Sequence, residues 1–451
     1  MRRIQISEPI SVGHARSLLM KFWQSWDRRR RVIGVTGTLV MLWGVTQGFA
    51  WLIAPSELEL TAEGRELFVH EWTPNDPLSG EGDGLGPVFN ANSCAACHAQ
   101  SGVGGAGGNK HNVRSFAVLP NRNDSNLYGG VVHANATAKH LLETDEQVLG
   151  QYPIIPGGVT VIGNCQVRLE DFNPVEFEEI NTPALFGAGL IDEISDWSIR
   201  QNAWGQSLTA LGKEFHGDFD ATMGKVRVLP DGRIGKFGWK AQFATVEEFV
   251  ATACAVEVGL TNSYRRQDAP GQFTADAEAA YDMTGYQLDS LTTFCLTLER
   301  PELVMPRNSK EHSAVVRGRQ VFAEIGCAEC HTPDLGGVKG LYSDLCLHNI
   351  SDPDHNGYVR EPEVPMPSNV PGLADWKTPP LWGVADSAPY MHDGSSPTLE
   401  DVIEKHGGDA KHTREQYLKG ISKKDRENLI AFLKALRAPP AGKPVAQIDE
   451  K

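Results

Sequence analysis

The sequence predicts a mainly α-helical protein with two similar domains in tandem, extended by long loops and insertions and preceded by one transmembrane helix. Three observations predict this fold class. An uncharged run of 23 residues, Val32–Ala54, lies near the N-terminus, a Cys-x-x-Cys-His motif occurs twice, and the residues around the two motifs resemble each other. At 451 residues the chain is long enough for two or three domains.

The first 54 residues carry a targeting signal. Residues 1–31 hold eight Lys and Arg against Glu8 and Asp27, a net charge of +6. The uncharged run 32–54 is long enough to cross a hydrocarbon core of about 30 Å, and the basic residues before it keep the N-terminus in the cytoplasm. We therefore predict a basic cytoplasmic tail, an inner-membrane anchor and a periplasmic body. A cleaved signal peptide is the alternative, because Gly48-Phe-Ala50 resembles a cleavage site.

The charge of the remaining chain excludes one class of partner. The whole chain carries −15, residues 1–31 carry +6 and residues 32–54 carry none, so the remainder carries −21. Binding to nucleic acid needs a basic face, so nucleic acid is excluded as a partner. A basic redox protein would suit this acidic body better.

The two Cys-x-x-Cys-His motifs predict covalently bound haem. They consist of Cys94, Cys97 and His98 in the first case, and of Cys327, Cys330 and His331 in the second. At this composition roughly 0.004 such motifs are expected by chance. Two thiols can add to the haem vinyl groups while the adjacent histidine reaches the iron, so we predict two haem c groups. A four-thiolate zinc site and a dithiol redox motif are the alternatives.

Four further cysteines remain, which are Cys165, Cys254, Cys295 and Cys346. An even number in an oxidising compartment predicts one or two disulfides, with three possible full pairings. Buried free thiols are the alternative.

An internal repeat surrounds the motifs. Gly64-Arg-Glu-Leu-Phe68 precedes the first and Gly318-Arg-Gln-Val-Phe322 the second, while Thr182–Gly187 downstream mirrors Thr378–Gly383. A helix with an aromatic residue, then the motif, then a loop that returns over the haem is the plan of a small c-type cytochrome domain. We therefore predict an N-terminal haem domain with insertions at 55–304, a C-terminal cytochrome c domain at 305–437 and a tail at 438–451.

The C-terminal domain is expected to end in a helix within Glu427–Leu436. Leu429, Ile430, Leu433 and Leu436 recur at helical spacing, and Pro439-Pro440 stops the helix. We expect these apolar residues in the core rather than in a site.

The segment Thr378–Gly394 resembles the bacterial di-haem cytochrome c peroxidase superfamily and the di-haem enzyme that matures methylamine dehydrogenase. Asp231–Ala241, Tyr342–Leu345 and His406-Gly-Gly408 are more similar to the di-haem oxidoreductases that carry the label of thiol oxidoreductases. The resemblance covers roughly residues 60–437. It implies a di-haem fold and cofactor more firmly than it implies a substrate.

The resemblance also implies a second iron ligand for the C-terminal haem. The superfamily places this ligand 14 residues after the His of its His-Asp-Gly motif, and that count leads from His392 to His406. Methionine would raise the haem potential, so histidine at this position implies a low-spin haem of lower potential, held by His331 and His406. A histidine that caps the helix begun near Thr398 is the alternative.

No such count leads to a second ligand for the N-terminal haem. The repeat offset carries His406 onto Ala210, so we interpret this haem as the open, reactive one. His111, His133 and His140 are the candidate ligands that would overturn this interpretation. Peroxide cleavage needs a group that moves a proton, and Asp192 and Glu193 are the nearest acidic candidates. A solvated helix start is the alternative for both.

Trp239 and His392 complete the predicted catalytic residues. The superfamily relays electrons between its haems through a Trp, and Trp239 is the candidate here, with buried packing as the alternative. His392 is expected to hydrogen-bond near a haem edge or propionate, or to hold a turn. Three basic residues could pair with propionates or lie on the surface, namely Arg233, Lys236 and Lys240.

A calcium loop is a further hypothesis. Asp352, Asp354, Asn356 and Glu363 occupy positions 1, 3, 5 and 12 of an EF-hand pattern, with Gly357 at position 6. The alternative is a plain Asx turn, because Pro362, Pro365 and Pro367 lie where the exiting helix should run.

The function predicted from the sequence is that of a peroxidase-type di-haem oxidoreductase. Electrons from a small cytochrome, a cupredoxin or a quinol-linked carrier would enter at the C-terminal haem. The N-terminal haem would reduce peroxide or another small oxidant, or form a high-valent oxidant. The alternatives are a di-haem electron carrier without catalysis, and a haem-dependent oxygenase or protein-modifying enzyme.

Overall fold

The structure is a computed structural model that describes residues 55–162, 165–215, 222–268, 280–351, 362–364 and 370–440. The described residues from Glu57 onward belong to one compact unit. Helices predominate over strands in the described residues, which confirms the mainly α-helical class. The predicted boundary between residues 304 and 305 stays a prediction.

In the described residues the α-helices are α3 (Glu57–Val69), α4 (Cys94–Cys97), α5 (Asp145–Gln151), α6 (Ala188–Asp192), α7 (Asp196–Phe215), α8 (Val246–Glu257), α9 (Gly285–Leu296), α10 (Ser309–Glu324), α11 (Leu399–Glu404), α12 (Lys411–Glu415) and α13 (Lys423–Leu433). The strands are β1 (Val88–Phe89), β2 (Val113–Val118), β3 (Tyr128–Val132), β4 (Asn135–Ala136), β5 (Gly158–Ile162), β6 (Cys165–Leu169), β7 (Val175–Ile180), β8 (Glu302–Leu303), β9 (Asp334–Leu335), β10 (Val338–Lys339), β11 (Leu347–Asn349), β12 (Asp375–Lys377) and β13 (Leu436–Arg437).

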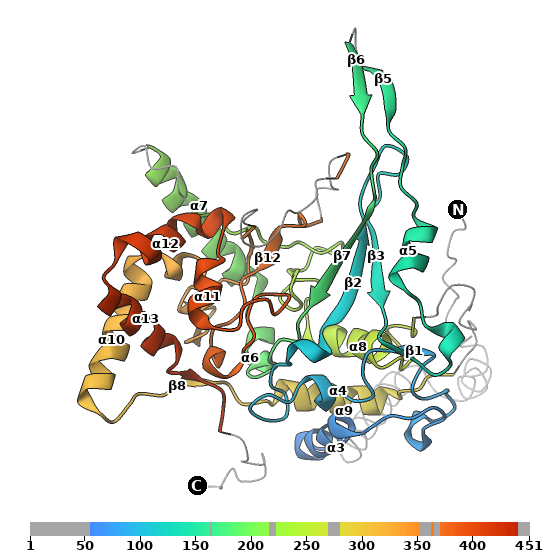
Figure 1. Ribbon diagram of the computed structural model, residues 1–451. Coiled ribbons are helices and arrows are strands. Elements are labelled where there is room, and N and C mark those ends of the chain that lie inside the picture. The colour runs from blue at the N-terminus through green and yellow to red at the C-terminus, as the bar shows by residue number, and fades with distance from the viewer. Residues whose placement is uncertain are drawn as a thin grey trace, which may run out of the picture. The chain divides into compact units, whose positions relative to one another are not determined.

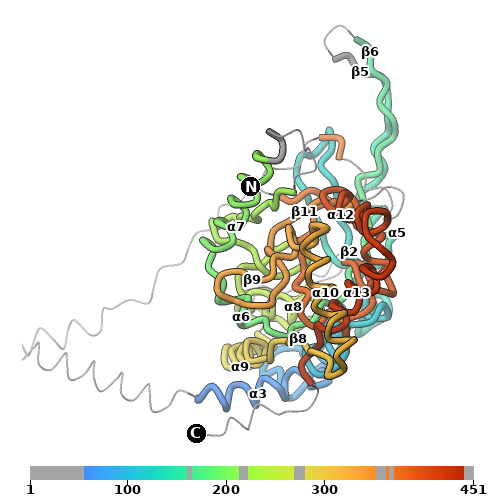
Figure 2. The backbone as a smooth tube through the Cα atoms, turned by 90° about the vertical axis from the view of Figure 1, so that its left-hand side faces the viewer, coloured from blue at the N-terminus to red at the C-terminus, as the bar shows by residue number. Residues whose placement is uncertain are grey.

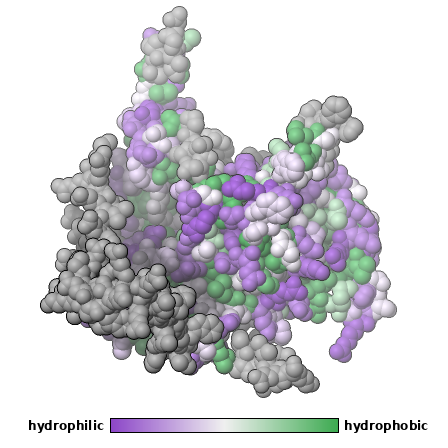
Figure 3. Space-filling view, turned by 180° about the vertical axis from the view of Figure 1, so that it is seen from behind, coloured by the Kyte–Doolittle hydropathy of each residue, from purple (hydrophilic) through white to green (hydrophobic). Residues whose placement is uncertain are grey.

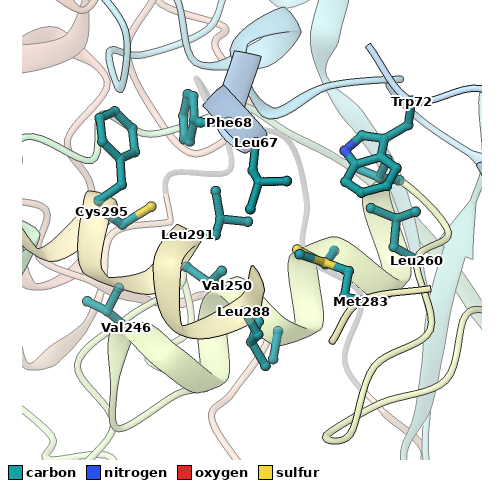
Figure 4. Packing of buried hydrophobic residues seen from close by; sticks show 14 of the residues in the cluster. Leu67, Phe68, Trp72, Val246, Val250, Leu260, Met283, Leu288, Leu291 and Cys295 are labelled. Carbon is teal, nitrogen blue, oxygen red and sulfur yellow. The ribbon is translucent and has the colours of Figure 1, made fainter. Parts of the chain in front are cut away.

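Helices α3 and α9 pack side by side and carry the core near the first Cys-x-x-Cys-His motif (Figures 1 and 2). A capping box of Thr284 and Gln287 begins α9. The two helices approach closely at Gly64, where a β-carbon would lie 1.9 Å from the carbonyl oxygen of Ser290. Leu67 and Phe68 of α3 lie among the side chains of α8 and α9 (Figure 4).

Helices α10 and α13 form the corresponding pair near the second motif (Figures 1 and 2). Ser422 begins α13 by accepting a hydrogen bond from the amide of Asp425. A β-carbon at Gly318 would lie 1.9 Å from the carbonyl oxygen of Asn428, the same approach as at Gly64. The four apolar residues predicted to be core are buried, namely Leu429, Ile430, Leu433 and Leu436. The helix ends at Leu433, before the predicted stop at Pro439-Pro440, and Leu436 lies on β13.

A three-stranded antiparallel sheet, β3-β2-β7, lies within the first half of the chain and was not foreseen from the sequence. Val113 pairs with Ile180, and Arg114 pairs with Val132. The hairpin β5–β6 extends beyond this sheet (Figure 1). The strand β7 leads directly into Asn181-Thr182-Pro183, the loop that the repeat had singled out, so the sheet positions this loop.

The surface of the described residues is mixed in hydropathy. Seen from behind, hydrophilic and hydrophobic residues are interspersed (Figure 3). Within the described part of the chain, no helix combines the length and the apolar composition that a membrane crossing requires. The predicted tail 1–31, the predicted span 32–54 and most of the tail 438–451 lie outside the described residues.

The structure contradicts the predicted disulfides. All eight cysteines lie in the described residues, and each is a free thiol in the structure. Cys165 is exposed on the hairpin, whereas Cys254 and Cys295 lie in the core of α8 and α9 and Cys346 lies in another cluster. The prediction was wrong because an even count and a compartment say nothing about position. Cys254, Cys295 and Cys346 follow the alternative of buried free thiols.

Candidate functional site

The first motif presents one histidine for metal binding. Ser93 caps the short helix α4 by accepting a hydrogen bond from the amide of Ala96, 3.2 Å away, and the chain turns at His98. The Nδ1 of His98 lies 3.1 Å from the carbonyl oxygen of Gly105. A carbonyl only accepts, so Nδ1 carries the proton and the lone pair of Nε2 is left for a metal. Burial lowers the pKa of His98 to about 4, which keeps the ring neutral near pH 7.

The second motif repeats this arrangement. His331 directs Nδ1 to the carbonyl oxygen of Tyr342 at 3.0 Å, and burial lowers the pKa of His331 to about 4. Phe322 lies 6.4 Å from the His331 ring at 53°, and Phe68 lies 6.2 Å from the His98 ring at 52°. The repeated Phe therefore lies at nearly the same distance and tilt from each histidine.

His406 lies in the same cavity as His331. It follows α11, and its Nδ1 lies 2.6 Å from the carbonyl oxygen of Val402, which leaves Nε2 available. The positive charge that His406 would carry also lowers the pKa of His331, because the two rings are close. His406 thus satisfies a carbonyl of the helix end, as the capping alternative requires, and also presents a second neutral imidazole. Its role as an iron ligand stays a prediction.

The residues around this cavity fit a haem c. Cys327 and Cys330 lie on its wall beside the two histidines, and most of the remaining lining is apolar or aromatic. Burial raises the pKa of Cys327 to about 12, so the thiol is neutral. Two neutral imidazoles, two thiols and an apolar wall are the groups that a covalently attached haem needs.

The positions of the two Cys-x-x-Cys pairs exclude a shared four-thiolate zinc site. Cys94 packs in the cluster of α3 and α9, whereas Cys327 packs in the cluster of α10 and α13. The two pairs therefore cannot share one ion. Across the described residues, no group of three or more His, Cys, Asp or Glu is arranged to hold a metal ion.

Trp239 and His392 lie together on the wall of the cavity that holds His331. The indole N–H of Trp239 donates to the carbonyl oxygen of Asn181 at 2.8 Å, and the ring lies 6.5 Å from that of His392. His392 stacks on Trp376 at 3.6 Å, and both line the cavity that holds His331. The amide of Asn181 in turn donates to the carbonyl oxygen of His392 at 2.6 Å. An aromatic chain thus connects the loop after β7 with the C-terminal cavity.

His392 also meets an acid that the sequence analysis missed. Its Nε2 lies 3.1 Å from Glu178, while its Nδ1 is buried and makes no hydrogen bond within the described residues. A buried ring nitrogen without a partner is costly. It agrees with the expectation that His392 hydrogen-bonds to a haem edge or propionate, which stays a prediction.

Asp192 and Glu193, the predicted acid–base residues, differ in their surroundings. Asp192 accepts a hydrogen bond from the amide of Val246 at 2.9 Å, at the first turn of α8, and its carbonyl oxygen accepts one from Lys236. Glu193 is exposed. Neither lines the C-terminal cavity. The catalytic role of both stays a prediction.

The three predicted basic partners are placed differently from one another. Arg233 is exposed and paired with Asp231 and Glu248. Lys236 is buried rather than on the surface, and Lys240 lies 3.3 Å above the Trp376 ring. Burial lowers the pKa of Lys240 to about 8.

The three candidate distal histidines of the first site differ in burial. His133 is buried, and its Nε2 lies 2.9 Å from the carbonyl oxygen of Val256. His140 is exposed, and His111 is partly buried with a pKa lowered by burial. None of the three is part of the C-terminal cavity.

The calcium hypothesis falls largely on residues outside the described ranges, because these exclude Asp352, Asp354 and Asn356. Glu363 is described, and it pairs with Arg122. Calcium therefore stays a prediction.

Sequence reasoning missed several buried charged residues. Asp344, His348 and Lys377 lie around the second motif, and Glu257, which is partly buried, lies near the first. Asp344 belongs to Tyr342-Ser-Asp-Leu345, one of the segments that carry the family resemblance, so the sequence gives a signal for Asp344. His348 and Glu257 carried none, because a lone His and a helical Glu are ordinary in sequence.

Comparison with known proteins matches residues 173–436 to the family model described as di-haem oxidoreductase. MauG, the methylamine utilization protein of Methylorubrum extorquens, is 30% identical over 169 residues, which cover 35% of this chain and 46% of that protein. Cytochrome c551 peroxidase of Nitrosomonas europaea is 27% identical over 122 residues, which cover 27% of this chain and 33% of that protein. The chain thus spans less than half the length of these relatives. The solved structure of the diheme peroxidase BthA from Burkholderia thailandensis covers 86% of this chain and 88% of its own, at 14% identity and a TM-score of 0.33.

Proposed function

This chain belongs to the di-haem oxidoreductase family, and on that premise we propose that it is a periplasmic peroxidase-type enzyme with two covalently bound haem c groups. When bound, the haems would supply one-electron chemistry and an iron at which peroxide is reduced. Each proposed haem domain is a small cytochrome unit built on one helix pair, α3 with α9 and α10 with α13. The repeated contacts at Gly64 and Gly318 support this reading.

One observation supports different roles for the two haem sites. His331 and His406 lie in one cavity and both present Nε2, so these residues would close both sides of the C-terminal site. His98 presents Nε2 at the first site, where His133 is engaged with Val256 and His140 is exposed. We therefore assign electron entry to the C-terminal site and peroxide reduction to the N-terminal site.

The aromatic chain supports transfer between the sites. Trp239 contacts the loop that follows β7 through Asn181, and it contacts His392, which stacks on Trp376. The hydrogen bonds of Trp239 and Asn181 fix the order of these rings. Trp239 is the residue that we propose as the relay.

The donor and the location are proposals that rest on the sequence. An acidic body suits a basic small cytochrome, a cupredoxin or a quinol-linked carrier. Residues 32–54 would anchor the chain in the inner membrane. Fusing alkaline phosphatase after residue 56 should give an active reporter, and an inactive one would contradict periplasmic exposure.

The decisive experiment is low-temperature EPR after one electron is added per molecule, followed by addition of peroxide. We expect a remaining high-spin ferric signal that peroxide changes. A purely low-spin signal that peroxide leaves unchanged would contradict catalysis and favour the electron carrier. Product analysis with a protein or small organic substrate would separate a peroxidase from an oxygenase.

A further inference from the structure

A cluster of buried charges surrounds the second cysteine of the C-terminal motif. His348 on β11 is 2% exposed, and its Nε2 lies 2.8 Å from the Asp344 carboxylate, which is fully buried. Its Nδ1 lies 3.6 Å from the sulfur of Cys330 and 3.7 Å from Asp409. His348, Cys330 and Asp409 all line the cavity that holds His331 and His406.

The hydrogen bonds fix the position of Asp344. Its carboxylate accepts from Gln206 of α7 at 2.9 Å and from the amide of Cys346 at 2.9 Å, in addition to its contact with His348. Gln206 also donates to the carbonyl oxygen of Glu329, within the Cys-x-x-Cys-His segment. The cluster is therefore joined to the backbone that carries the motif.

The partners of His348 also fix its protonation. Asp344 and Asp409 are carboxylates that only accept hydrogen bonds, and a thioether sulfur carries no hydrogen. Both ring nitrogens therefore face acceptors once Cys330 is attached to haem, and both must carry a proton. Although burial lowers the pKa of His348, the contacts with Asp344 and Asp409 raise it, in agreement with this geometry.

We propose that His348 is a buried imidazolium that donates its Nδ1–H to the sulfur of Cys330, and that it thereby positions the C-terminal haem and raises its reduction potential. The inference rests on the proposed function only in taking haem as the group attached at Cys330. A positive charge and a hydrogen bond at the attached sulfur favour the electron-richer, reduced state.

The first motif provides the contrast. The sulfur of Cys97 has no hydrogen-bond donor among the described residues, and burial, with a smaller contribution from nearby Glu257, raises the pKa of Cys97 to about 11. Glu257 itself accepts from Asn90 at 2.5 Å. The second cysteine thus faces a cation at one site and a carboxyl group at the other, so His348 acts on one haem only.

The test is a spectroelectrochemical titration of the holoprotein and of His348→Leu, His348→Gln and Asp409→Asn, with exposed His312→Gln as the control. We expect His348→Leu to lower the ferrous-to-ferric ratio of the C-terminal haem about tenfold at a fixed potential, a shift of about 59 mV. His348→Gln, which keeps an N–H donor, should shift it less. The N-terminal haem and the control should not change.

Asp409→Asn removes an anion from the same cluster and should therefore raise the reduction potential of the C-terminal haem. Because Asp409 is partly exposed, this variant can be measured even if the His348 variants do not fold. Equal shifts of both haems, no shift in any variant, or the same sign for His348→Leu and Asp409→Asn would overturn the proposal. The titration needs no turnover, so inactivity with peroxide would refute the proposed function without touching this inference.

Discussion

The two Cys-x-x-Cys-His regions share one packing frame. In each, a glycine lets two helices approach, with a β-carbon position 1.9 Å from a carbonyl oxygen, and a Phe lies 6.2 or 6.4 Å from the motif histidine. That Phe packs on a second Phe at 5.2 Å in the first region and 5.5 Å in the second. Each motif histidine donates Nδ1–H to a backbone carbonyl. The frame alone therefore does not distinguish the two sites.

The surroundings of the two frames do distinguish them. His406 shares a cavity with His331, and His348 lies against the sulfur of Cys330. Near Cys97 the charged neighbour is Glu257. Similar helix pairs can therefore carry different chemistry. The residues that determine the chemistry of each site come from the stretch of chain that connects the two helices of its pair.

The largest expected effect comes from making the second site resemble the first. His406→Ala should remove one imidazole from the C-terminal cavity and convert the whole low-spin signal of that haem to high-spin. EPR of the oxidised holoprotein measures this, with exposed His312→Ala as the control. An unchanged low-spin signal would show that His406 is only a helix cap.

The frame can be broken at either glycine. Gly64→Ala and Gly318→Ala should each destabilise the protein by about 1–3 kcal/mol or more, because the new methyl group meets a backbone carbonyl that cannot easily move. Urea denaturation measures both. Gly205→Ala on α7, where nothing lies within 4 Å, should instead be neutral or stabilising by up to about 1 kcal/mol. A cost at only one of Gly64 and Gly318 would contradict a shared frame.

The sequence predicted the frame better than the surroundings. The motifs and the repeated Gly-Arg-x-x-Phe segments are contiguous, so their pattern is visible, and α13 follows from its apolar spacing. The reason for Gly318 is not visible, because Asn428 meets it only after folding. His348 and Glu257 were not predicted because a single His or a helical Glu gives no signal in the sequence, even though Asp344 lies only four residues from His348. The sheet β3-β2-β7 was not predicted from the sequence because its strands bury only one small hydrophobic cluster.

Glu257, near the first motif, should make the stability of the folded protein depend on pH. Burial raises its pKa from 4.5 to about 7 in the folded protein, so the folded state binds a proton that the unfolded state has released. The stability from this group is present below about pH 4.5 and is lost as pH rises through about 7, at most about 3 kcal/mol at about 1.4 kcal/mol per unit.

Glu257→Gln should therefore flatten the pH dependence of unfolding between those values. Denaturation at pH 5 and pH 8 measures the change, and exposed Glu66→Gln should leave the slope as it is. A slope that survives in Glu257→Gln would place the titrating group elsewhere.

The smallest expected effect on stability concerns the link between the two regions. Trp239→Phe keeps an aromatic ring beside His392 but loses the indole hydrogen bond to Asn181, at a cost of about 1 kcal/mol. The same variant should slow the redistribution of a single electron between the haems, which stopped-flow spectroscopy follows, whereas exposed Trp197→Phe should change neither quantity. If stability falls while the electron redistributes at the original rate, Trp239 serves packing only, and the two regions exchange electrons by a route that does not use this ring.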